Sequence, residues 1–137
     1  MSRLKISFEL VKKQFFPRWD RKNEWTISKG EPPAPGAQGY CERATKTITI
    51  RDLPHDQNNL YFLLIHEVCH VLSTDSHGWR WKDRMLMASR MAKKKGNVQL
   101  SRMILFDLKK LRRFGETKGA SRHSLDCRGF LFSDERR

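Results

Sequence analysis

Residues 66–70 read His-Glu-Val-Cys-His, and the six residues before them are all apolar or aromatic. Side chains four positions apart lie one above the other on an α-helix, so His66 and His70 can present their imidazoles to one metal ion while Glu67 stands beside them. In zinc hydrolases with this arrangement, the metal activates a water molecule and the carboxylate moves its proton. The spacing predicts one Zn²⁺ site with two histidine ligands and Glu67 as catalytic base.

A catalytic zinc site needs a third protein ligand and one open position. His77 is the favoured third ligand, because Gly78 beside it permits a close turn that can carry the imidazole back to the metal. Asp75 and Asp83 compete for this role. The metzincin motif does not fit, since Ser73 stands where that motif needs glycine and His77 comes one residue too late.

Other groups near the motif leave alternatives open. Tyr40, Tyr61 or Arg80 could donate a hydrogen bond to the oxyanion that forms during attack on a peptide bond, and the sequence does not choose among them. Cys69 lies inside the motif, where a thiol on a buried helix is expected to pack as part of the core.

The composition describes a small and strongly basic protein. Its 137 residues are enough for one domain, and 28 Lys and Arg against 15 Asp and Glu give a net charge of +13. Such a field favours an acidic partner, for which DNA is the leading candidate. The three cysteines form no Cys-x-x-Cys pair, and neither a signal-peptide core nor a run of 18 apolar residues is present. We expect a cytoplasmic or nucleoid-associated protein with no membrane segment.

The elements that position the motif begin with a helix over residues 3–16, where apolar residues recur at helical spacing until Pro17. Short strands are expected around residues 25–27, 39–41 and 45–50, separated by a loop rich in proline and glycine. These strands predict a small sheet of two or three members, antiparallel or mixed.

Three helices are expected to follow. The metal-binding helix, over residues 58–72, is apolar on most faces and should be buried. Residues 79–95 place Trp81, Met85, Ala88 and Ala92 on one stripe, and residues 98–114 repeat the pattern. The sequence thus predicts one α+β domain over residues 1–114, and a basic, poorly ordered tail over residues 115–137.

The last two helices carry most of the charge. Residues 82–113 contain 11 Lys and Arg against Asp83 and Asp107, a net charge of +9, which favours contact with phosphates. Trp19, Trp25 and Trp79 could stack on unpaired bases, although at least two of them are expected in the core. The candidate nucleic-acid contacts are Lys82, Arg84, Arg90, Lys93, Lys94, Lys95, Lys109, Lys110, Arg112 and Arg113.

Taken together, these motifs resemble the SprT-like zinc metallopeptidases, the family that includes Spartan. The family has a Gly-x-Cys segment before a short strand, then the His-Glu-x-x-His helix, then His-Gly-x-x-Trp-Lys at the start of the next helix. Here these are residues 39–41, 47–50, 66–70 and 77–82. The resemblance covers about residues 36–92. It implies a minimal zincin-like domain with His66, His70 and His77 on one zinc ion and Glu67 as base.

By this resemblance, the protein would be a zinc metalloendopeptidase that cleaves proteins bound or crosslinked to DNA. The sequence has no cysteine-rich zinc ribbon of the kind found at the C-terminus of several members, so DNA contacts are expected from the basic helices. One alternative is a non-catalytic module in which zinc, with a fourth ligand such as Asp75 or Asp83, stabilises a fold that binds DNA or protein. Another is a repressor-cleaving metallopeptidase of the ImmA type, which shares the first motif but does not account for residues 77–82.

Overall fold

The structure is a computed structural model that describes residues 2–33, 35–74 and 77–115, without the side chains of residues 111–115. The elements in chain order are α1 (Arg3–Phe15), β1 (Thr26–Lys29), β2 (Gly39–Glu42), β3 (Thr47–Ile50), α2 (Gln57–Ser73), α3 (Trp79–Lys94) and α4 (Val98–Gly115). The predicted α+β class and the four predicted helices are confirmed. The predicted tail lies outside the described residues except for Gly115, which ends α4. No described helix is long and apolar enough to span a bilayer.

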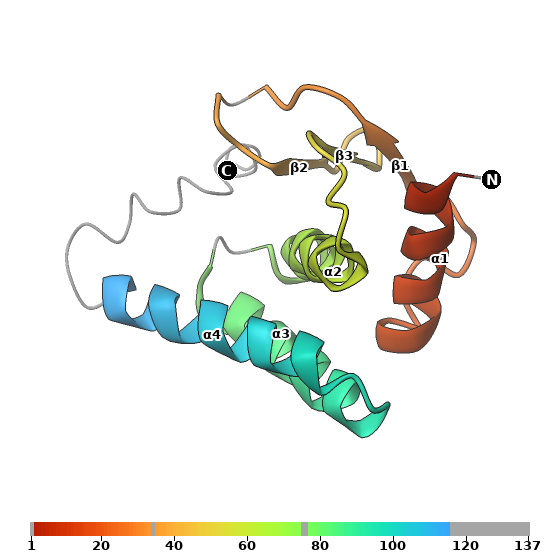
Figure 1. Cartoon of the computed structure of the whole chain (residues 1–137). Coiled ribbons are helices and arrows are strands. Elements are labelled where there is room, and N and C mark those ends of the chain that lie inside the picture. The colour runs from red at the N-terminus through yellow and green to blue at the C-terminus, as the bar shows by residue number, and fades with distance from the viewer. Residues whose placement is uncertain (1, 34, 75–76, 116–137) are drawn as a thin grey trace.

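Helix α2 lies in the middle of the fold (Figure 1). The sheet covers one side of it, the α3–α4 pair covers the opposite side, and α1 packs against its flank. The helix begins after Asp56, whose carboxylate accepts a hydrogen bond from the backbone N–H of Asn59 at 3.0 Å. Leu60, Leu64 and Val68 are fully buried, and the other apolar side chains of the helix are buried or partly buried against the core. The predicted burial of this helix is therefore confirmed.

The sheet is mixed, with strand order β1-β3-β2. Strands β2 and β3 are antiparallel, as expected, whereas β1 pairs with β3 in parallel. Ile27, Ile48 and Cys41 form one row across the three strands, and all three are buried. This row belongs to the hydrophobic core that also contains the apolar face of α2.

The α3–α4 pair closes the other side of the core. The predicted stripe on α3 is confirmed, because Trp81, Met85, Ala88 and Ala92 are all buried. Helix α4 adds Leu100 and Ile104. Between the two helices the hydroxyls of Ser89 and Ser101 lie 2.8 Å apart and satisfy each other, so small residues allow close packing without an unpaired polar group.

A buried ion pair fixes the loop between α1 and β1. Nζ of Lys12 lies 2.8 Å from Oδ2 of Asp20 and 2.9 Å from Oδ1 of Asn23. Oδ1 of Asp20 also accepts from the backbone N–H groups of Glu24 at 2.7 Å and Trp25 at 3.2 Å. The side chains of Lys12 and Asp20 are only 7% and 2% exposed. The carboxylate therefore sets the path by which the chain enters β1.

Removing the buried carboxylate should be costly. We expect Asp20→Ala to lower the free energy of unfolding by about 3–5 kcal/mol, because it removes the close, buried counter-charge of the Lys12 ammonium and leaves only the carboxylate of Glu9, which is 52% exposed and 3.6 Å away. Glu24→Gln is the matched control: its pair with Lys46 is about half exposed, at 51% and 47%, so the loss should stay below about 1 kcal/mol. Urea denaturation measures both. Equal losses in the two variants would contradict the role given to the buried pair.

Candidate metal centre

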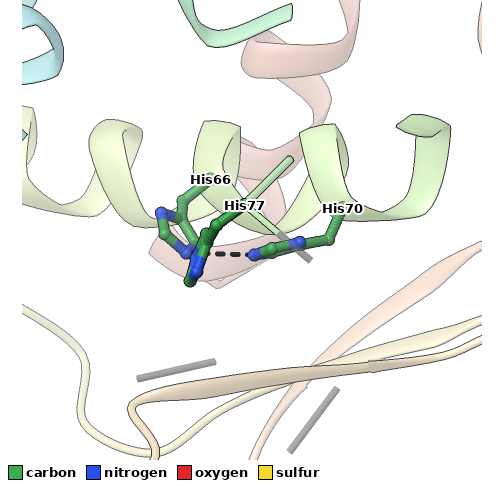
Figure 2. A group of neighbouring side chains, drawn as sticks. All are labelled: His66, His70 and His77. Atoms are coloured by element: carbon green, nitrogen blue, oxygen red, sulfur yellow. Dashed lines mark hydrogen bonds between the residues drawn. The ribbon is translucent and has the colours of Figure 1, made fainter. Parts of the chain in front are cut away.

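Three imidazoles converge on one side of α2 (Figure 2). His66 and His70 project from adjacent turns of the helix, and His77 points toward them from the segment before α3. The candidate ligand atoms of the three residues all lie within 4.8 Å of one another, and Nε2 of His66 is 3.3 Å from Nε2 of His70. Tetrahedral zinc with Zn–N bonds of about 2.0–2.1 Å holds two nitrogens about 3.3–3.4 Å apart. The triad therefore fits one zinc ion with small side-chain adjustments.

A sharp change of direction brings His77 to the triad. Thr74 ends α2 in the left-handed conformation with φ 62°, and its N–H donates to the carbonyl of His70 at 3.3 Å. His77 itself has φ 58°. Gly78 has φ −82° and serves as the N-cap position of α3. The expected left-handed glycine is not observed, since the residues with left-handed backbone are Thr74 and His77 and not Gly78.

The ligand group holds three residues. Within residues 2–33, 35–74 and 77–115, no fourth His, Cys, Asp or Glu joins it. Asp83 is exposed on α3, and Asp75 lies outside the described residues. Cys69 is buried, as expected for core packing, and burial raises the pKa of its thiol. Three histidines on a tetrahedral zinc ion leave one position for water or substrate.

Burial also sets the protonation state of the His66 imidazole. The pKa of His66 is lowered to about 4 because the charged imidazolium would be desolvated. The ring is therefore neutral at pH 7, with a nitrogen lone pair that can bind a metal. This ligand does not have to lose a proton before zinc binds.

Glu67 follows His66 directly in the sequence, and its carboxyl is in a desolvated position. The residue is 1% exposed, and Oε1 has no hydrogen-bond partner in the described part of the chain. Burial raises the pKa of this carboxyl to about 8. A nearby divalent cation favours the ionised form, so the group can exchange a proton near neutral pH. These are the properties that a general base requires.

Strand β2 approaches this carboxyl at a glycine. A Cβ atom on Gly39 would lie 2.6 Å from Oε2 and 3.0 Å from Cδ of Glu67, closer than such contacts allow. Only glycine at position 39 therefore leaves the carboxyl in its place. The sequence marked the Gly-x-Cys segment by resemblance alone, and this contact gives its glycine a physical role.

Trp81 forms an aromatic wall against the triad. It is fully buried, and its ring centroid lies 5.0 Å from that of His66, 5.3 Å from that of His70 and 4.5 Å from that of His77. Its plane is within 22° of the His70 ring. The indole N–H donates to the backbone carbonyl of His66 at 3.4 Å. One side chain from α3 thus limits the orientation of all three ligands.

A second side chain holds the end of α2. The guanidinium of Arg43, which follows β2, donates to the backbone carbonyls of His70 at 2.7 Å and Val71 at 3.1 Å. These carbonyls belong to the last turn of the helix, where a cation also complements the helix dipole. The sequence analysis missed Arg43, because no local pattern shows which carbonyls a distant arginine will reach.

The basic candidates lie on the surface of the α3–α4 pair. Lys82 is half-buried, and the side chains of Arg112 and Arg113 are not described. Arg102, which was not among the candidates, is exposed as well. The tryptophans divide as expected, since Trp19 and Trp25 pack against the core while Trp79 is 72% exposed. The exposed candidates are Arg84, Arg90, Lys93, Lys94, Lys95, Lys109 and Lys110.

Removing the aromatic wall should loosen the metal site. We expect Trp81→Ala to weaken zinc affinity about 10–100-fold, and Trp81→Phe to weaken it less, because the phenyl ring keeps a surface against the imidazoles. Met85→Ala is the control for a core cavity, since Met85 is equally buried one turn further along α3. Titration against a chelator of known affinity measures all three. If Met85→Ala weakens binding as much as Trp81→Ala, the wall has no specific role.

No protein-family model matches this sequence, and searches of the curated proteins and of the solved structures find no match. The functional interpretation therefore depends on the geometry of the site.

Proposed function

We propose that this protein is a zinc-dependent peptidase with a zincin-like domain of the SprT type. His66, His70 and His77 hold one zinc ion, and Glu67 is the general base. The observation that carries this proposal is the group of three histidines with ligand atoms within 4.8 Å, together with the 1% exposed carboxyl of Glu67, the residue after His66. Zinc supplies a water molecule with its pKa lowered to about 7 and polarises the carbonyl under attack.

The protein's own groups supply the proton transfers. Oε1 of Glu67, which has no partner among the described residues, accepts the proton of the attacking water. The same carboxyl then delivers this proton to the nitrogen of the leaving amine. Gly39 leaves the space that this carboxyl occupies, because a Cβ atom there would displace it. Trp81 and Arg43 keep the ligands oriented, which limits reorganisation during the reaction.

The position of β2 supports a peptide as substrate. In the strand order β1-β3-β2 it is an edge strand, and in the described part of the chain it pairs only with β3. An extended peptide can add to such an edge through backbone hydrogen bonds. Because Gly39 lies on β2 next to Glu67, a peptide bound there would have its backbone close to the general base.

The non-catalytic alternative is less well supported. A structural zinc site is usually closed by four protein ligands, and Asp83, one candidate for the fourth, is exposed and outside the group. Burying the Glu67 carboxyl costs free energy, and a purely structural site would give no functional reason for that cost. The ImmA-type alternative shares the same hydrolytic chemistry and differs in substrate.

DNA-associated proteins are the substrate class that we propose. The support is the set of exposed lysines and arginines on α3 and α4, within a chain of net charge +13. Such a surface attracts phosphates by counterion release, and would bring the peptidase close to proteins on DNA. Cleavage that is stimulated by DNA and loses this stimulation with added salt is the expected behaviour.

Replacing the general base tests the mechanism. In Glu67→Gln the side chain keeps its size but cannot accept the proton, so we expect zinc content to stay at one ion per chain and peptide hydrolysis to fall at least about 10²–10⁴-fold. Zinc is measured by atomic absorption, and hydrolysis on an unstructured protein substrate with and without DNA. A zinc-loaded Glu67→Gln protein that cleaves at the wild-type rate would contradict the assignment.

The position of the Glu67 carboxyl can be changed without replacing Glu67 itself. Gly39→Ala should displace the Glu67 carboxyl and lower kcat about 10²-fold while zinc remains bound. Gly30→Ala is the matched control at the end of β1, where the new Cβ would lie an ordinary 3.6 Å from Cγ2 of Thr49. Steady-state kinetics on both variants measure the difference. Comparable losses in kcat would show that the Gly39 contact does not position the base.

A further inference from the structure

A groove runs between α3 and α4, apart from the metal-ligand group. It encloses about 620 Å³. We call it the α3–α4 groove, and its lining residues are Trp79, Lys82, Asp83, Leu86, Leu105, Leu108 and Lys109. Four of the seven are large apolar residues. Two lysines line it, one from each helix.

The apolar surface of this groove is unusually exposed for a soluble domain. Trp79 is 72% exposed and Leu105 is 43% exposed. Contiguous apolar surface framed by charged residues is characteristic of interaction sites, and tryptophan is among the residues that contribute most to binding energy.

The lining positions fit a helical partner. On α3 they are spaced i, i+3, i+4 and i+7, and on α4 they are spaced i, i+3 and i+4. The α3 positions span about 10 Å along the helix axis at 1.5 Å per residue, or about two turns. A third helix laid into the groove could therefore insert two or three apolar side chains from one face.

We propose that the α3–α4 groove docks an amphipathic, acidic helical segment of a protein partner. Apolar side chains of the segment enter the groove, and its acidic residues face Lys82 and Lys109. We take this partner to be the substrate protein, and that identification rests on the proposed peptidase function. The groove would hold that protein at a point separate from the bond to be cleaved.

The location supports a role in substrate docking. Trp79 follows the ligand His77 by only two positions, so the groove begins beside the segment that completes the triad. A second pocket of about 350 Å³ shares Trp79 and Asp83 with the groove and extends to Ser73 at the end of α2. A segment in the groove would therefore lie next to the elements that carry the metal ligands.

Charge and shape favour a peptide over nucleic acid in this groove. Of the four apolar lining residues only Trp79 offers a flat ring on which a base can stack, and the three leucines offer none. The lining carries only two cations and one carboxylate, whereas Arg84, Arg90 and Lys93 are exposed elsewhere and do not line it. A few acidic residues around an apolar face match this lining better than a continuous phosphate backbone.

Binding is tested with zinc-loaded, full-length Glu67→Gln protein, so that cleavage does not interfere. The probe is a fluorescent 16-residue helical peptide with leucines on one face and glutamates on the other, and anisotropy is measured. A peptide of the same composition with the leucines scattered, a version with lysine in place of glutamate, and a single-stranded oligonucleotide are compared. We expect the first peptide to bind at least 10-fold more tightly than the other two peptides.

Substitutions locate the site. The double variant Lys82→Glu/Lys109→Glu should bind the acidic peptide at least 10-fold more weakly than the parent protein. Leu105→Asp should weaken binding by a similar factor. Arg90→Glu is the control, because it reverses an exposed charge on α3 outside the groove. The proposal is overturned if Arg90→Glu weakens peptide binding as much as the groove substitutions do. It is also overturned if the peptide with scattered leucines binds as tightly as the amphipathic peptide. Three further results would overturn it, each pointing to another occupant of the groove. They are an oligonucleotide that competes with the peptide, a dimer in sedimentation that depends on the groove residues, and peptide binding that appears only after residues 116–137 are removed.

The outcomes separate docking from catalysis. Loss of peptide binding in Leu105→Asp while wild-type protein cleaves the substrate supports both proposals. Groove-independent peptide binding in a protein that hydrolyses peptides overturns the docking proposal alone. Groove-dependent binding in a zinc-loaded wild-type protein that hydrolyses nothing overturns the peptidase proposal and the naming of the partner as substrate.

Discussion

A single helix supplies both the centre of the hydrophobic core and most of the polar groups of the candidate metal site. Helix α2 packs against β2, α1, α3 and α4, and its residues His70 and Glu67 are each 1% exposed. Imidazoles and a carboxyl in such a position lose hydration, which is costly unless they find partners. A zinc ion bound by the histidines would offset this cost and favour the ionised carboxylate beside it. The rest of the structure is arranged around this constraint.

The chain around β2 and α3 contributes the contacts that hold the polar groups in place. Strand β2 supplies Gly39, which gives the carboxyl its space, and Arg43 after it binds the carbonyls at the end of the helix. Helix α3 supplies Trp81, which packs against the three imidazoles. The turn before α3 brings in His77. Loss of any one contact is therefore expected to affect the site before it unfolds the protein.

Local patterns in the sequence were sufficient to predict the helices and two of the three candidate metal ligands. Apolar periodicity fixes helix type and burial without knowledge of the partners, and the four-residue spacing of His66 and His70 fixes their common direction. The spacing also predicted His77 as the third candidate ligand. The explanation by Gly78 was wrong, because the residues with left-handed backbone are Thr74 and His77.

The features that the sequence did not reveal depend on contacts between distant segments. The parallel pairing of β1 with β3 results from how the whole chain packs, and no single strand encodes it. The roles of Gly39, Arg43 and Trp81 likewise appear only when three elements meet around α2. The charge of the α3–α4 surface was evident from composition, but composition could not show that an apolar groove separates its lysines.

X-ray absorption at the zinc edge of the purified protein, combined with metal analysis, tests the central claim most directly. The account predicts one zinc per chain, bound by three imidazole nitrogens and one further light atom at about 2.0–2.1 Å, with one imidazole fewer in His77→Ala. A sulfur ligand, a fourth protein ligand that closes the site, or failure to bind zinc at all would contradict it.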